Sequence, residues 1–395
     1  MTTPAPQIVP MSLRERVDAA CAVAERNAVE TDAAAEFPVA ALDELRRQGL
    51  LGLLVPEGYG GLGGGVDELL AATNELGRVD LSVAMIFAMH CQQTAAVVDH
   101  AAQPLRDFLL PRLAEGLYLA SVTTEVGKGG DLLSAQSQLT ADDEWLVIDR
   151  VAPIVTGGAY ADGFLVTARS PWARSEREVS LVYADRSQLR VETSGCWNPL
   201  GMRASHSVAL RLEGRVPDWQ VIGRHGGFRD IAVTGFAALA HLGWAAAWLG
   251  AASGAMSRVL TLLRSPKERG RVNLDSELLV SRLSQARQRL ETVHALIRHT
   301  ASLVVKTKEN GEDLSRPRHQ LLINTLKITA SEETYRAVEN LIDAVGLRHG
   351  YLKDSPTGLE RVMRDLRSAA LNFNNDRLHL ADGRLALLDP EVGFA

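Results

Sequence analysis

The sequence predicts a mainly helical α+β protein built from three consecutive domains. We expect an N-terminal α-helical domain over residues 1–117, a small β-domain of sandwich or barrel type over 118–227, and a four-helix bundle over 228–395. Three observations predict this order: helical periodicity at the start, short runs of β-branched residues in the middle, and long helical periodicity at the end. A chain of 395 residues, 46% of them hydrophobic, can bury the core of about two or three such domains.

The first domain contains one conspicuous break in its helical pattern. From about residue 12 to residue 117 the sequence shows alanine-rich amphipathic stretches, interrupted by VPEGYGGLGGG at residues 55–65. A glycine-rich loop can cradle phosphate, but no Lys-Ser or Lys-Thr pair follows this one and no strand clearly precedes it. We therefore expect a structural turn.

The middle and last domains differ in their residue patterns. Runs such as WLVID, GFLVTA, SLVYA and SVALRL are separated by Gly, Asp and Ser, which is typical of short strands. After residue 227 the helical period returns, and apolar residues follow in alternating steps of four and three at Leu279, Leu283, Ala286, Leu290, Val293 and Ile297. This stripe predicts a long bundle helix, whose apolar face can continue across a subunit interface.

Charge and composition narrow the classes of partner. The net charge is −6, the sequence pI is near 6.0, and basic residues are interspersed with acidic ones, which argues against nucleic-acid binding. The first twenty residues carry charges where a signal peptide needs an apolar segment, and no uninterrupted apolar run approaches transmembrane length. Cys21, Cys91 and Cys196 lie far apart without a CxxC pair, so no disulfide framework or metal site is expected. We predict a cytoplasmic protein that binds small molecules, without a membrane partner.

Two short polar motifs in the middle domain are candidates for cofactor binding. YLASVTTEVGKGGD, at residues 118–131, combines hydroxyl groups, one acid and three glycines, and can bring backbone N–H groups against a polar cofactor edge. In IVTGGAYAD, Thr156 stands beside two glycines at the end of a predicted strand, where it can bond a ligand. Turn formation explains that threonine equally well.

Taken in order, these segments resemble the acyl-CoA dehydrogenases over nearly the whole chain. The matching segments are FP at Phe37 and Pro38, LRRQGLLGLLVPEGYGGLG at 45–63, TTEVGKGGD (similar to TEPxAGSD), IVTGGAYAD (similar to WITNxxxAD), WNPLGMRASHS (similar to LGxRxSxT), VGLRHGY (similar to GGxGY) and RVMRDLRSAAL (similar to the RD-containing helix). The resemblance implies FAD between the β-domain and the bundle, and a homo-oligomer, either a dimer or a tetramer. The cofactor contacts that it implies fall on Val122, Thr123, Thr124, Thr156, Arg269, Gly270 and Gly346.

The sequence departs from the family pattern at several cofactor positions. Ile154 stands where family members have an aromatic residue beside the flavin. The RxxFG motif, which in the family reaches the FAD of a neighbouring subunit, appears here as PKERG, where only Gly270 matches. Lys267 or Arg269 can still meet a pyrophosphate as a point charge. A glutamine that usually follows is Glu277. These changes predict weaker FAD binding.

The departure with the largest consequence concerns the catalytic base. Counted from the RD pair, the common catalytic glutamate of the family falls on Phe373, and its alternative position falls near Ala240. Removal of a proton α to a thioester carbonyl needs a positioned base, which neither residue can supply. Asp376 and His241 lie close to these two positions and are the candidate substitutes. The simpler interpretations are an exposed helix aspartate and a packed histidine.

The predicted substrate contacts also differ from the family pattern. Gly130 replaces a serine, and His241 replaces an arginine that meets CoA in relatives, so a carrier-protein thioester or a substrate without a thioester becomes more credible. Phe373 and Asn374 are further predicted substrate contacts, although a helix cap explains the asparagine as well.

Three functions remain open at this point. The first is α,β-dehydrogenation of an acyl thioester, with electrons passed to a flavoprotein or to O₂. The second is a flavin-dependent monooxygenase, because some relatives with this fold use reduced flavin and O₂ and need no carboxylate base. The third is a catalytically silent homologue, which the altered FAD contacts and the missing glutamate suggest.

Overall fold

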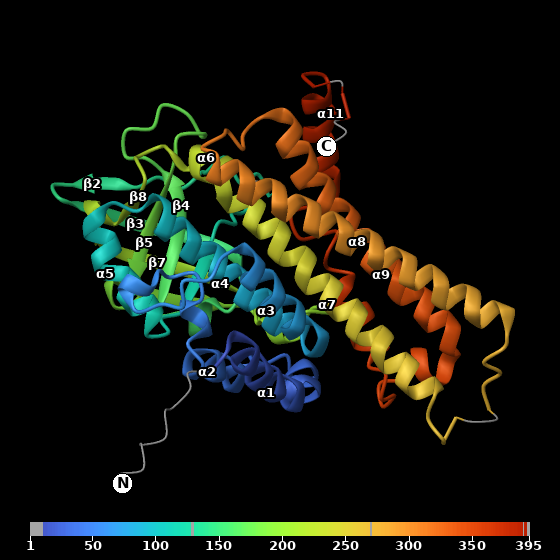
Figure 1. Cartoon of the computed structure of the whole chain (residues 1–395). Coiled ribbons are helices and arrows are strands. Elements are labelled where there is room, and N and C mark those ends of the chain that lie inside the picture. The colour runs from blue at the N-terminus through green and yellow to red at the C-terminus, as the bar shows by residue number, and fades with distance from the viewer. Residues whose placement is uncertain (1–10, 128–129, 269–270, 390, 393–395) are drawn as a thin grey trace, which may run out of the picture.

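Helices form the first part of the computed structural model, which describes residues 11–127, 130–268, 271–389 and 391–392 (Figure 1). They are α1 (Leu13–Ala34), α2 (Val39–Arg47), α3 (Val66–Val79), α4 (Leu81–His100) and α5 (Gln103–Ala114). Ser12 begins α1 through a reciprocal capping box with Glu15. The glycine-rich break forms a tight turn, because a Cβ on Gly61 would lie 2.1 Å from the carbonyl oxygen of Val55. The structural turn that the sequence predicts is therefore present.

The middle part consists of two four-stranded sheets. One has the order β1-β4-β5-β8 and the other the order β2-β3-β7-β6. The strands are β1 (Leu119–Val122), β2 (Thr140–Asp142), β3 (Trp145–Val155), β4 (Gly163–Arg169), β5 (Val179–Asp185), β6 (Leu189–Ser194), β7 (Val208–Pro217) and β8 (Val221–Ile222). The pairing of β3 with β7 is irregular between Ala152 and Val155, directly before Thr156. This bulge re-aims the chain at the strand end that carries the predicted cofactor threonine.

Long helices return after the strands and form the bundle (Figure 1). They are α6 (Phe228–Ile231), a π-helical turn (Ala232–Phe236), α7 (Ala237–Leu263), α8 (Glu277–Glu309), α9 (Pro317–Gly350), α10 (Leu359–Leu366) and α11 (Asn375–Ala386). Helices α7, α8 and α9 pack against one another, and α11 packs on α9. The structure thus confirms the predicted fold class: mainly helical, with a small β-region in the middle and a helical bundle at the C-terminal end.

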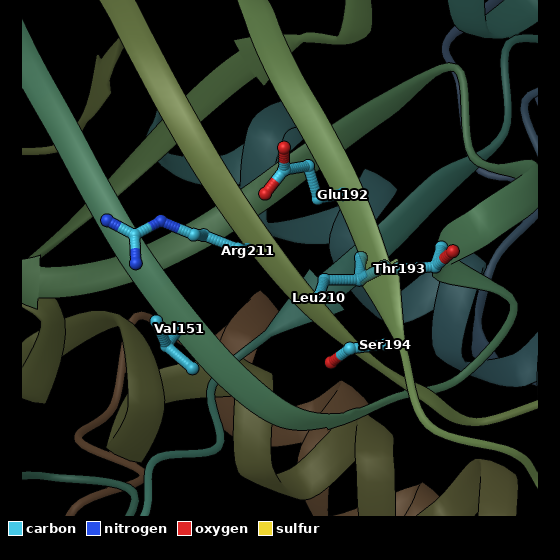
Figure 2. A pocket seen from close by; sticks show the side chains of 6 residues that line it. All are labelled: Val151, Glu192, Thr193, Ser194, Leu210 and Arg211. Carbon is cyan, nitrogen blue, oxygen red and sulfur yellow. The ribbon is translucent and has the colours of Figure 1, made fainter.

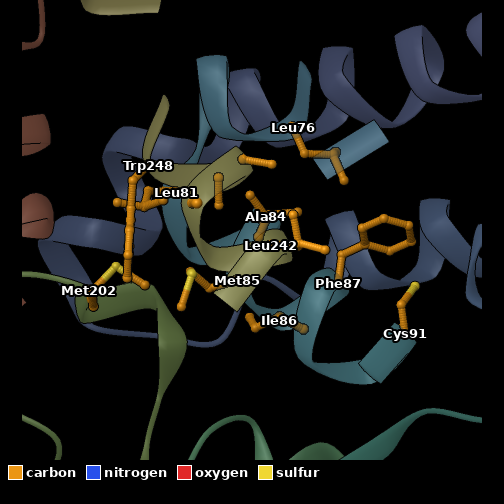
Figure 3. Packing of buried hydrophobic residues seen from close by; sticks show 14 of the residues in the cluster. Leu76, Leu81, Ala84, Met85, Ile86, Phe87, Cys91, Met202, Leu242 and Trp248 are labelled. Carbon is orange, nitrogen blue, oxygen red and sulfur yellow. The ribbon is translucent and has the colours of Figure 1, made fainter. Parts of the chain in front are cut away.

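Helix α7 is fixed by close contact with α3 of the first domain. A Cβ on Gly77 would lie 2.5 Å from the carbonyl oxygen of Ala247, and one on Gly250 would lie 2.1 Å from that of Asn74. The two backbones therefore touch, which only glycine permits. Figure 3 shows part of the buried cluster at this junction, including Trp248 of α7. This packing places α7 firmly beside the β-domain.

Two helices among the described residues have the length and hydropathy of membrane-crossing segments. They are Leu81–His100 and Phe228–Leu263, and both are interrupted by polar residues such as Gln92 and His241. Within the tested windows, 83% and 67% of the residues are buried inside the protein. Burial explains the composition, because a helix surrounded by core needs no polar face.

Candidate active site

The end of β3 presents an apolar surface between hydroxyl groups. Ile154 is 50% exposed, and its carbonyl oxygen accepts a 2.8 Å hydrogen bond from Thr124 Oγ1. The hydroxyl oxygens of Thr156 and Ser207 lie 3.1 Å apart. An apolar face with hydroxyl groups at its edge fits a flavin ring, which stacks on one side and needs hydrogen bonds at its rim. Val122 differs from these residues, because its side chain is buried in the core.

The acid of the TTEVG motif belongs to a buried ion pair. Glu125 lies 3.0 Å from Arg150, and the two side chains are 4% and 1% exposed. Arg150 also donates to the carbonyl oxygen of Thr124, at 2.8 Å. Burial raises the pKa of Glu125, but hydrogen bonds from the N–H groups of Gln136 and Ser137, together with Arg150, outweigh burial and lower it. The pair therefore anchors the loop that contains Thr123 and Thr124.

His241 is the predicted base that lies against Phe373. It is buried on α7, and the two ring centres are 5.7 Å apart. Its Nδ1 lies 3.3 Å from the carbonyl oxygen of Ile323 on α9, so Nδ1 donates and carries the proton. Burial, followed by the charge of Lys327, lowers the pKa of His241 to about 3. The imidazole is therefore neutral at neutral pH, with its lone pair on Nε2.

Asn374 and Asp376, which follow Phe373, lie at the start of α11. The Oδ1 of Asn374 accepts a 2.7 Å hydrogen bond from the backbone N–H of Asp376, which makes Asn374 the N-cap. Asp376 is exposed on the first turn of the helix. Among the described residues, no contact joins its side chain to His241 or Phe373. The structure therefore separates the two candidate bases, because His241 packs on Phe373 and Asp376 is exposed at the start of α11.

The remaining predicted contacts lie in turns. Gly130 is exposed with a φ of 82°, a left-handed conformation that favours glycine over the serine of relatives. Gly346 has a φ of 67° and kinks α9. Arg269 and Gly270 lie outside the described residues, but Glu268 next to them is 3.6 Å from His349 and 3.8 Å from Arg348. Glu268 therefore lies beside the residues that follow Gly346.

The second sheet also carries a depression (Figure 2). It is lined by Val151, Glu192, Thr193, Ser194, Leu210 and Arg211 of β3, β6 and β7. Arg211 is held by Asp149 and Glu213, at 3.2 and 2.6 Å. Among the residues that the structure describes, none of the predicted site residues lines this depression, and Arg211 is already paired.

Sequence reasoning missed two buried cations at the site. Arg150 interrupts the alternating pattern of β3 on its buried face. Lys327 stands in LLINTLKITA at a position that shares the buried face of α9 with Ile323, Ala330 and Thr334. A charged residue on the apolar face of an amphipathic element is a signal that a sequence can show.

Comparison with known proteins agrees with this geometry. The family model of the N-terminal domain of acyl-CoA dehydrogenase matches residues 11–117, and that of the C-terminal domain matches residues 227–372. An acyl-CoA dehydrogenase of Bacillus subtilis is 24% identical over 335 residues, which cover 84% of this chain and 85% of the relative.

Two solved structures show the same fold. Butyryl-CoA dehydrogenase from Megasphaera elsdenii aligns with a TM-score of 0.82 at 20% identity, over 98% of this chain and 100% of the other. The dibenzothiophene monooxygenase TdsC from Paenibacillus sp. A11-2 aligns with a TM-score of 0.82 at 22% identity, over 96% and 98%. TdsC is also known in an FMN-bound structure. The chain therefore belongs to the acyl-CoA dehydrogenase superfamily and is a flavin-dependent oxidoreductase with FAD as its cofactor.

Proposed function

We propose that the protein oxidises an acyl thioester between its α- and β-carbons, with His241 as the proton acceptor in place of the family carboxylate. One observation carries this proposal. The Nδ1–H of His241 is engaged by the Ile323 carbonyl, which leaves the Nε2 lone pair as the basic atom next to Phe373. No carboxylate of the described residues contacts either ring.

Each side of the site has a distinct role in this reaction. Thr124 and Thr156 would hold the edge of the flavin ring, and Ile154 would support its face. Bound FAD would supply an acceptor for the hydride of the β-carbon. Nε2 of His241 takes the α-proton, and the Ile323 carbonyl stabilises the imidazolium that forms. The thioester belongs to CoA or to a carrier protein, and the electrons pass to a flavoprotein or to O₂.

A second function is favoured by the weak basicity of this histidine. A base whose pKa is about 3 has little driving force to accept a proton, and its protonation would place a second positive charge near Lys327. A neutral imidazole beside Phe373 also suits a monooxygenase, in which reduced flavin and O₂ act on a substrate that His241 only orients by hydrogen bonding.

The two functions are separated by the oxidant that the substrate reaction needs. Purified protein with bound FAD is mixed with acyl-CoA and acyl-carrier thioesters in the absence of O₂. The absorbance of the oxidised flavin at about 450 nm is then followed. Dehydrogenation bleaches the flavin under these conditions. A failure of every thioester to bleach it, combined with O₂-dependent product formation after flavin reduction, identifies the monooxygenase. Repeated failure to bind FAD would support the silent homologue instead.

A further inference from the structure

Lys327 is a buried cation that the proposed reaction does not use. It lies on α9 with no exposed surface. Its Nζ donates to the carbonyl oxygen of Phe373 at 2.9 Å and to Oδ1 of Asn375 at 2.7 Å. The ammonium also lies 5.9 Å from the ring centre of Trp248 on α7. All of its described polar contacts therefore go to the segment that carries Phe373.

Such a placement needs a compensating interaction. Burial of an ammonium group is costly unless hydrogen-bond acceptors replace its water, and an aliphatic residue would fit this apolar face of α9 at less cost. Burial lowers the pKa of Lys327 to about 7, while Glu332 on the same helix opposes this shift. The compensating interactions are the hydrogen bonds to the Phe373 carbonyl oxygen and to Oδ1 of Asn375.

The segment held by Lys327 has a conformation that needs support. Phe373 has a φ of 50°, in the left-handed region, which is strained for a residue other than glycine. The side chain of Asn375 is held from both ends, because its Nδ2 also donates to Ser331 Oγ at 3.1 Å. Two residues of α9 thus fix the turn through its backbone and its asparagine.

Ring contacts connect the Phe373–Asn375 turn back to Lys327 through His241. The ring centres of Phe373 and His241 are 5.7 Å apart. The ring centres of His241 and Trp244 are 5.8 Å apart, and those of Trp244 and Trp248 are 6.3 Å apart. Trp248 in turn lies next to the Lys327 ammonium. A shift of the Phe373 carbonyl would therefore move the ring that packs on His241.

We propose that Lys327 is a positioning residue, whose ammonium group clamps the Phe373–Asn375 turn and so holds the ring of Phe373 against His241. Its effect on turnover rests on the proposed function. The clamp itself does not, because it is a property of the turn in the resting protein.

Hydrogen–deuterium exchange of the flavin-loaded protein tests the clamp. In Lys327→Met, amides of residues 371–376 should exchange at least about tenfold faster, since the turn then opens locally. Thr334→Val is the matched control, because Thr334 is equally buried on α9 but bonds only within its own helix, to Ala330 at 2.7 Å. Unchanged exchange in Lys327→Met would overturn the proposal. If this variant does not fold, Asn375→Leu removes the acceptor side and should give the same local increase.

Turnover then tests the positioning role. With any thioester that bleaches the flavin, Lys327→Met should lower kcat about 10–100-fold, and Lys327→Gln, which keeps a donor, should recover part of the loss. In the background of Phe373→Leu, Lys327→Met should have little further effect. Full activity in Lys327→Met with a loosened turn would overturn the positioning role. If no thioester reacts with the wild type, the proposed function fails while the exchange result still decides the clamp.

Discussion

The two sides of the candidate active site are built in different ways. The β-domain side consists of a strand end and a loop beside it, in which Thr124 donates to the carbonyl oxygen of Ile154, two residues before Thr156. The bundle side brings His241, Lys327 and Phe373 together from α7, α9 and the turn before α11. The first side keeps the threonines that the family resemblance assigns to the flavin but has Ile154 in place of an aromatic residue, and the second side lacks the family glutamate. We therefore expect cofactor binding and reaction chemistry to be separable, and substitutions can test each side alone.

Replacement of His241 should remove proton transfer on the bundle side and leave flavin binding on the β-domain side intact. We expect His241→Gln to slow anaerobic flavin bleaching by a thioester about 10²–10⁴-fold, because general-base catalysis contributes that much, while FAD content stays unchanged. His319→Gln is the control, since His319 is also buried and bonds a backbone carbonyl, that of Asp313, outside the site. Loss of FAD in His241→Gln would show that the two sides are not separable.

Removal of Arg150 should damage the flavin side first. Arg150→Met leaves the Glu125 carboxylate buried without its cation, which we expect to lower the free energy of unfolding by about 3–5 kcal/mol in urea denaturation. FAD should be lost together with the order of the Thr123–Thr124 loop. Arg150→Met combined with Glu125→Gln should recover part of the stability. If the double variant is no more stable than Arg150→Met alone, the ion pair does not anchor the loop.

A smaller change at the strand end should weaken FAD without touching the base. Thr156→Val removes one hydroxyl, and we expect the Kd for FAD to rise about 3–10-fold, which corresponds to one ordinary hydrogen bond. Titration of the apoprotein with FAD, followed by flavin fluorescence, measures the change. Thr193→Val on exposed β6 is the comparison variant. An equal rise of the Kd in both variants would show that the Thr156 hydroxyl does not bind the flavin.

The stability that comes from the contact between α10 and the β-domain should depend on pH. Asp365 of α10 accepts a 2.5 Å hydrogen bond from the backbone N–H of Met202 in the β-domain, and burial raises its pKa to about 7. The folded protein therefore binds a proton that the unfolded chain releases above its ordinary pKa of ~3.9, so stability decreases as pH rises from about 4 to 7. Asp365→Asn should flatten this part of the stability curve, measured by Tm. An unchanged slope would contradict the assignment.

The fold and the flavin side could be predicted from the sequence because their signals are local. Short runs of β-branched residues, helical periodicity and the motif around Thr156 can each be recognised within a short segment of the sequence. The bundle side could be predicted only in part. Counting along the chain identified Phe373 and two candidate bases, but could not show that Asp376 lies exposed at a helix start while His241 is buried against the ring. Lys327 was missed because its partner is 46 residues away in the chain.

Proton transfer itself tests the central claim most directly. Phenylacetyl-CoA has acidic α-hydrogens and no β-hydrogen, so its α-position can exchange with D₂O without any hydride transfer. We expect the wild-type protein with bound FAD to introduce deuterium at this position, followed by mass spectrometry, and His241→Gln to do so at least about 100-fold more slowly. Deuterium uptake at the same rate in both proteins, or no uptake by a wild-type protein that binds the thioester, would contradict the account of His241 as the base.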